Sequence, residues 1–266
     1  MSALAAHASN DGESLNEAEF VKEGETLEEF LRGKFKIIQK EKGYRFSIDS
    51  VLLANFVHLS EGDRVIDLGT GCGVIPLLLS CHMKKGEIIG VEIQPEYVDM
   101  ASRSVKLNGM EHMIQIVEGD FKKVIKQFPR ESFNVVISNP PYIPINAGRV
   151  NPSNDKAIAR HEVAANLEDL IKIAKYLVKS RGKVFVVYAA NRLTDLFTKL
   201  RENGLEPRRF QMVHSNEGSE AKIALLEAVN GGKPDLHVMR PLFVYNLEGT
   251  YTDEMTEILN EGNNHH

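Results

Sequence analysis

The stretch VIDLGTGCG, from Val65 to Gly73, joins an apolar run to a glycine-rich turn. The apolar run is typical of a buried strand, and the glycines let the backbone turn tightly and let a ligand lie against it. The segment VIPLLLSCHM that follows predicts an apolar helix. Val74 stands where the dinucleotide fingerprint places its third glycine, so a pyrophosphate ligand is disfavoured. The stretch therefore predicts a ligand-binding loop between a strand and a helix.

Strand-like and helical segments alternate on both sides of this loop. The expected strands are RVIDL, EIIGVEI, MIQIVEG, FNVVIS and GKVFVVYAA, and helical patterns separate them, which implies a parallel sheet. The last two, PRRFQMVHS and KIALLEAV, have no helix between them and imply an antiparallel hairpin at the sheet edge. We therefore predict an α/β fold with a seven-stranded, mostly parallel sheet, an antiparallel last strand, and helices on both faces.

The remaining segments predict additions to this core. Residues 1–30 carry a net charge of −7 and are expected to be disordered or loosely held. The segment from Gly33 to Ser50 predicts a hairpin around KEKG, and SVLLANFVHL predicts a short helix. The domain prediction is a segment 1–30, a hairpin and helix extension 31–60, a core domain 61–230, and an appendage 231–266 on the sheet edge with a helix from about Thr252.

Composition restricts the class of protein. The 266 residues are 42% apolar, which is enough for one domain of generous size. No stretch approaches the roughly 20 apolar residues that span a bilayer, and no signal peptide is expected. Cys72 and Cys81 match no zinc pattern, so we expect a reducing, cytoplasmic location and no metal site. The net charge of −5 leaves +2 outside residues 1–30, which permits a nucleic-acid partner.

Three acidic residues follow three successive strands. Asp67, Glu92 and Asp120 stand at the carboxyl ends, where open α/β sheets bind ligands. A carboxylate at the end of the second strand can accept hydrogen bonds from both hydroxyl groups of a ribose. A carboxylate at the end of the third strand can accept a hydrogen bond from an adenine amino group. Each residue taken alone is equally consistent with a helix cap.

Together with the glycine loop, these acids resemble the Rossmann-like, class I S-adenosylmethionine-dependent methyltransferase superfamily over about residues 60–230. The resemblance implies S-adenosyl-L-methionine as the cofactor and S-adenosyl-L-homocysteine as the product. It further implies that the methionine part is held by Asp67 with Gly69, Gly71 and Gly73. The ribose is then held by Glu92, and the adenine by Asp120 with Phe121.

The segment NPPY, from Asn139 to Tyr142, ends the fourth strand, because proline cannot donate to a sheet ladder. It resembles the signature of methyltransferases that act on planar nitrogens, and it also borders the cofactor site. Such a nitrogen is a poor nucleophile, because its lone pair is delocalised. The Asn139 oxygen and the Pro140 carbonyl can each accept one N–H and aim the lone pair at the methyl group, and Tyr142 can stack on the planar group.

Other segments select among the planar nitrogens. GYRFSIDSVLLANFV, from Gly43 to Val57, resembles the N-terminal motif of bacterial tRNA adenine-N6 methyltransferases that modify the adenine 3′ of the anticodon of a valine tRNA. ARHE after NPPY, EPRRFQMVHS and the tail PLFVYNLEGTYTDE also resemble that family. The resemblance implies that the cofactor pocket is lined from the N-terminal side by Tyr44, Phe46, Ser47 and Asp49, although hairpin and helix packing explains each of these residues as well.

The predicted function is therefore transfer of a methyl group to N6 of adenine in tRNA. Methylation of a protein glutamine amide, as by release-factor methyltransferases, and a cofactor-binding module without catalysis are the alternatives. We expect a monomer or weak dimer with a tRNA partner, no stable protein partner and no membrane. Candidate RNA contacts, each also consistent with a solvated surface charge or, for the histidine, a loop anchor, are Arg149, Lys156, Arg160, His161, Arg208 and Arg209.

Overall fold

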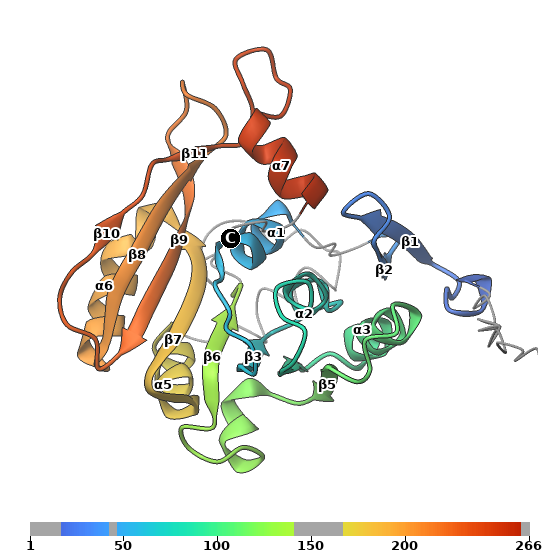
Figure 1. Ribbon diagram of the computed structural model, residues 1–266, viewed down its shortest axis with the longest axis horizontal. Helices are drawn as coiled ribbons and strands as arrows, with labels where there is room; N and C mark the ends of the chain where they lie inside the picture. Colours follow the sequence, from blue (N-terminus) through green and yellow to red (C-terminus); the bar gives the residue numbers. More distant parts are fainter. Residues whose placement is uncertain (1–16, 43–46, 141–166, 262–266) are drawn as a thin grey trace, which may run out of the picture.

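The computed structural model describes residues 17–42, 47–140 and 167–261 and contains one large sheet (Figure 1). The predicted strands form this sheet in the order β8-β9-β7-β6-β3-β4-β5. β9 runs antiparallel to both neighbours, whereas the other strands pair in parallel. The predicted fold class is thus confirmed. The strands are β3 (Arg64–Leu68), β4 (Glu87–Glu92), β5 (Ile114–Glu118), β6 (Phe133–Ser138), β7 (Val178–Ala189), β8 (Leu205–His214) and β9 (Ala221–Asn230).

The terminal hairpin ends the row of predicted strands, as expected. β8 and β9 pair antiparallel, and β9 lies between β7 and β8. The sequence of β9 explains its place, because residues 223–228 are all buried and need partners on both sides. Two short strands, β10 (His237–Val238) and β11 (Leu242–Phe243), then pair in parallel with β8 and cover that edge.

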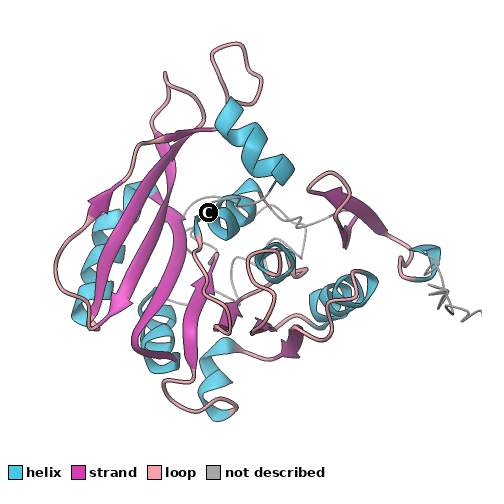
Figure 2. Ribbon diagram, in the orientation of Figure 1, coloured by secondary structure: helices cyan, strands magenta, loops and turns pink. Residues whose placement is uncertain are grey.

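Helices cover both faces of the sheet (Figure 2). One hydrophobic core holds residues of α1, α2 and α3, and a second core holds residues of α5 and α6. Side chains of a strand alternate between these cores, as Val136 and Ile137 of β6 do. The first face carries α1 (Ile48–Phe56), α2 (Val74–Leu79) and α3 (Pro95–Leu107), and the second carries the 3-10 helix η2 (Phe121–Lys126), α5 (Leu167–Leu177) and α6 (Leu193–Glu202), which follows η3 (Ala190–Arg192).

The N-terminal hairpin lies one strand earlier than predicted. β1 (Glu25–Phe30) pairs antiparallel with β2 (Phe35–Lys40), and a further 3-10 helix, η1, spans Glu17–Glu19. The expectation of a loosely held segment therefore does not hold for residues 17–30. The reason is tertiary, because the acidic side chain of Glu25 accepts two hydrogen bonds from Arg103 of α3, at 2.6 and 2.8 Å. A partly buried, bidentate ion pair of this kind holds the acidic strand against α3.

The C-terminal segment reaches further than the sheet edge. After β11 the chain forms α7 (Asp253–Glu261), close to the predicted start at Thr252. Met255 and Ile258 of α7 are 0% and 8% exposed and belong to the same core as α1. In Figure 1, α7 lies beside α1. The C-terminal segment thus packs its helix α7 against α1, in the N-terminal part of the molecule.

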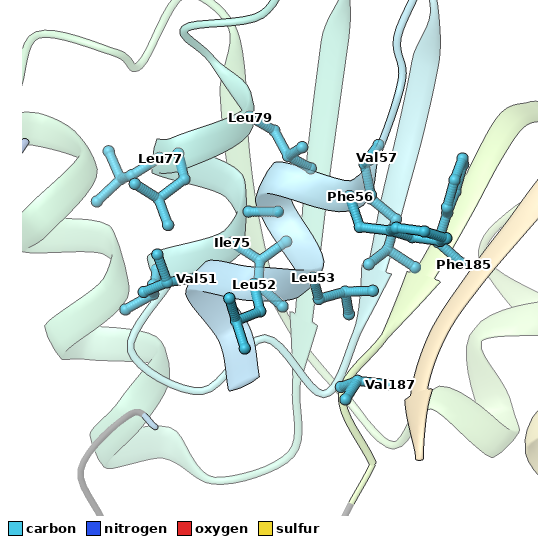
Figure 3. Packing of buried hydrophobic residues seen from close by; sticks show 14 of the residues in the cluster. Val51, Leu52, Leu53, Phe56, Val57, Ile75, Leu77, Leu79, Phe185 and Val187 are labelled. Atoms are coloured by element: carbon cyan, nitrogen blue, oxygen red, sulfur yellow. The ribbon is translucent and has the colours of Figure 1, made fainter. Parts of the chain in front are cut away.

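Helix α1 is held by apolar contacts on several sides. Figure 3 shows its residues Val51, Leu53 and Phe56 among side chains of α2 and of β7. Phe56 meets Phe185 of β7 edge to face, with ring centroids 6.1 Å apart. This packing fixes the position of α1 relative to the sheet. No helix in the described part of the chain is long and apolar enough to cross a membrane.

Candidate functional site

The glycine loop connects the end of β3 to the start of α2, and its glycines have a left-handed backbone. The φ angles are 83° at Gly69, 58° at Gly71 and 84° at Gly73, a region that other residues rarely adopt. A Cβ atom at Gly69 or Gly71 would meet no heavy atom within 4 Å, whereas one at Gly73 would lie 3.1 Å from the Cβ of Ala101. Gly73 therefore serves helix packing, while Gly69 and Gly71 leave open space beside the backbone for a ligand.

Asp67 is fully buried beside this loop, with 0% of its surface exposed. Neither carboxylate oxygen has a hydrogen-bond partner within the described residues, and the buried hydroxyl of Thr70 has none either. Burial raises the pKa of Asp67 to about 7; the Thr70 hydroxyl, near but outside hydrogen-bond geometry, opposes the rise, and the charge of Glu92 adds to it. Orphaned buried polar atoms are costly. The arrangement therefore fits a polar, preferably cationic, ligand group.

Sequence reasoning missed two residues of this arrangement, Thr70 and Gly90. Gly90 pairs with Asp67 across β3 and β4, and a Cβ atom there would lie 2.9 Å from the Thr70 side chain. Glycine at this position thus makes room for the loop. A glycine inside the apolar strand EIIGVEI was the available signal, because glycine in a strand often marks a close backbone approach.

Glu92, the last residue of β4, ties the loop to the start of α3. Its Oε2 accepts the backbone N–H of Gly71, and its Oε1 accepts those of Ile93 and Gln94, all at 2.9 Å. Burial raises the pKa of Glu92, and these three N–H groups oppose the rise. The capping alternative therefore applies to Glu92. A carboxylate has about four acceptor positions, so three bonds still leave capacity for a ligand hydroxyl.

Asp120 and Phe121 follow β5, the next strand in the sheet. Oδ1 of Asp120 accepts the backbone N–H of Lys122 at 2.9 Å, which is a cap at the start of η2. Phe121 is 7% exposed and packs into the core that contains α5. The N–H of Gly119 donates to the carbonyl of Glu92 at 2.8 Å, which joins the two strand ends. The three predicted carboxylates thus lie at the ends of three adjacent strands.

The NPPY segment begins where β6 ends, at Ser138, as the prolines predicted. The Ser138 hydroxyl donates to the carbonyl of Leu68 at 2.8 Å and so joins this strand end to the glycine loop. Asn139 is partly buried, and its Nδ2 donates to the Ser50 hydroxyl of α1 at 2.9 Å. Pro140 is buried. Asn139 and the glycine loop therefore both lie at the carboxyl ends of the parallel strands.

The N-terminal motif, from Gly43 to Val57, reaches the carboxyl ends of the strands through α1. Ser47 caps α1 with extended backbone geometry but makes no side-chain cap bond, and Asp49 lies in the first turn; both are partly exposed. The other predicted site residues lie outside the described part of the chain; they are Tyr44, Phe46, Tyr142, Arg149, Lys156, Arg160 and His161.

Arg208 and Arg209 of β8 are engaged elsewhere. Arg208 pairs with Asp235 at 3.0 Å, near β10. The Arg209 guanidinium lies over the Phe56 ring, 4.3 Å from its centroid, donates to the Phe56 carbonyl at 2.8 Å, and pairs with the buried Glu227 at 3.5 Å. These contacts lie at the C-terminal end of α1, and the phosphate contact of Arg209 stays a prediction. The sequence showed only its charge.

Relatives of this chain carry tRNA-methyltransferase names. A protein of Pedobacter heparinus named tRNA1(Val) (adenine(37)-N6)-methyltransferase is 24% identical over 86% of this chain and 94% of its own length. A protein of the same name from Bacteroides thetaiotaomicron is 25% identical over 85% and 87%. A solved structure of a predicted O-methyltransferase from Agrobacterium tumefaciens superposes with a TM-score of 0.65, at 22% identity, over 80% of this chain and 96% of that one. At this identity, the structure shows a shared fold.

The family model described as methyltransferase small domain matches residues 44–203, more than half of the chain. The match includes the glycine loop, the three strand-end carboxylates and NPPY. This chain belongs to the methyltransferase small domain family.

Proposed function

We propose that this protein transfers a methyl group from S-adenosylmethionine to the N6 amino group of an adenine in tRNA. By analogy with its relatives, this adenine is adenine 37 of a valine tRNA. The observation that carries the proposal is the position of Asn139. Its carboxamide stands at the end of β6, which the Ser138 hydroxyl joins to the glycine loop between β3 and α2. An acceptor for amine hydrogens thus lies beside an open, glycine-lined ligand site.

The residues around the loop suit the cofactor. S-adenosylmethionine supplies an electrophilic methyl group on a sulfonium. We assign the open backbone of Gly69 and Gly71 and the unpartnered carboxylate of Asp67 to its methionine part, where Asp67 would neutralise a cationic amino group. We assign Gly73 to the geometry of the loop, Glu92 to the ribose, and Asp120 with Phe121 to the adenine. The N-terminal wall of the pocket is assigned to Tyr44, Phe46, Ser47 and Asp49.

The NPPY segment would hold the target amine. The Asn139 Oδ1 and the Pro140 carbonyl accept its two N–H groups, so that the nitrogen lone pair turns towards the methyl group, and Tyr142 stacks on the base. An adenine in an anticodon loop is already unpaired, so its extrusion costs less than flipping a base from a duplex. We propose phosphate contacts by Arg149, Lys156 and Arg160, and keep His161 as a loop anchor or RNA contact.

Cofactor affinity should depend on pH through Asp67. The protonated carboxyl cannot pair with a cation, and burial holds its pKa at about 7 in the free protein. Binding of a cationic group should therefore weaken as pH falls through 7, roughly eightfold between pH 7.5 and pH 6. Titration calorimetry at several pH values measures this. Asp67→Asn should bind weakly at every pH, without this dependence; an equally steep dependence in Asp67→Asn would assign the titration to another group, such as Glu92.

The substrate test compares two classes of acceptor. Purified protein with tritiated S-adenosylmethionine is offered valine tRNA transcripts and, separately, a release factor. We expect label in the tRNA, and N6-methyladenosine as the methylated nucleoside by mass spectrometry. A valine tRNA in which guanine replaces the adenine 3′ of the anticodon is the matched control and should stay unlabelled. Label in the release factor alone would instead support the glutamine alternative.

A further inference from the structure

The hydrogen bond between Asn139 and Ser50 joins the NPPY segment to a distant part of the chain. Nδ2 of Asn139 donates to Oγ of Ser50 at 2.9 Å. Ser50 lies in the first turn of α1 and is 6% exposed. A carboxamide has a donor end and an acceptor end, so the pairing of its Nδ2 with Ser50 leaves the acceptor end to face the other side.

Both partners of this bond are held in place. α1 carries Ser50 between α2 and the sheet, with Val51 and Leu53 3% and 0% exposed in the adjoining core (Figure 3). Ser138, which precedes Asn139, donates its hydroxyl to the carbonyl of Leu68. The Ser50 oxygen therefore occupies a fixed position relative to the end of β6.

We propose that Ser50 is a positioning residue that sets the orientation of the Asn139 carboxamide. With Nδ2 committed to Ser50, Oδ1 is the end that is left for the target, and this oxygen accepts no hydrogen bond from the described residues. A target that donates N–H is then matched, and a ring nitrogen that only accepts is not. Ser50 thereby selects an exocyclic amine over a ring nitrogen, which deepens the proposed function and rests on it.

A spectroscopic test requires no substrate. In the 1H–15N spectrum of the folded protein, the Asn139 side-chain amide is assigned by its loss in Asn139→Asp. We expect one downfield-shifted Nδ2 proton in the original protein and its upfield movement in Ser50→Ala. Ser80→Ala is the matched control, because Ser80 is a buried serine at the C-cap of α2 whose hydroxyl donates to the carbonyl of Leu77. An Asn139 amide signal that is the same in Ser50→Ala would overturn the proposal.

A kinetic test separates positioning from packing. Ser50→Ala should lower kcat for tRNA about tenfold, with both KM values within about twofold, because it loosens one hydrogen bond of about 1.4 kcal/mol. In the Asn139→Asp background the same change should cost less than about twofold, because the two carboxylate oxygens are equivalent and need no orientation. Ser50→Thr, which keeps the hydroxyl, should recover most of kcat.

The outcomes distinguish this inference from the proposed function. Equal losses in both backgrounds, or no loss in either, would assign Ser50 to packing alone and overturn the inference. If the original protein methylates no tRNA, the proposed function fails, and the amide spectrum still decides whether Ser50 orients Asn139. Thermal unfolding of each variant shows whether α1 remains folded.

Discussion

Replacement of Asn139 by alanine is expected to reduce methyl transfer about 10²–10³-fold while cofactor affinity stays within about twofold. The side chain offers the acceptor oxygen at the end of β6, and its only described partner is Ser50, not a residue of the glycine loop. Its removal therefore leaves the loop unchanged but deprives the target amine of one acceptor. Single-turnover assays with tritiated S-adenosylmethionine measure transfer, and titration calorimetry measures cofactor binding.

Asn134→Ala is the matched control for this variant. Asn134 lies in the same strand, but at its opposite end, where its Oδ1 accepts from the backbone N–H of Arg64 and from Lys179. We expect a lower unfolding temperature from Asn134→Ala and nearly unchanged transfer. Retained turnover in Asn139→Ala would remove Asn139 from the mechanism.

Replacement of Glu92 by alanine is expected to weaken cofactor binding about 100-fold. The change removes the proposed ribose contact and also the acceptor of three backbone N–H groups, including that of Gly71. Charge-assisted hydrogen bonds contribute about 1.5–3 kcal/mol each, so the loss of one or two accounts for this factor. The dissociation constant by titration calorimetry is the measurement.

Two variants divide the effect of Glu92. Glu87→Ala changes the first residue of β4, which pairs with Arg64 at the other end of the strand, and should leave the dissociation constant unchanged. Glu92→Gln keeps one acceptor oxygen and should give an intermediate affinity. If Glu92→Ala binds the cofactor as tightly as the original protein, Glu92 is only a cap.

Local patterns were sufficient to predict the sheet and the glycine loop. The glycines of the loop permit the left-handed backbone that Gly69, Gly71 and Gly73 adopt, and the paired prolines end β6 at Ser138. Such features depend on residues that are neighbours in the chain, so the sequence displays them directly.

Features that depend on distant partners were missed or misread. The acidic β1 is ordered because Arg103, far along the chain, pairs with Glu25. Arg209 showed only its charge in the sequence, whereas in the structure it lies over the Phe56 ring and pairs with Glu227. Ser50 and Thr70 carried no signal of their own, since a serine in a helix or a threonine in a loop is common. Only the structure shows that they lie beside Asn139 and Asp67.

The contact of α7 with α1 bears on how this core is completed during synthesis of the chain. α1 holds Ser50 and is made early, whereas α7, which covers the same core with Met255 and Ile258, is made last of the described elements. Until α7 leaves the ribosome, the apolar surface around α1 is incompletely covered. A chain that has not yet formed α7 holds α1 against α2 and β7 but leaves part of this apolar surface exposed.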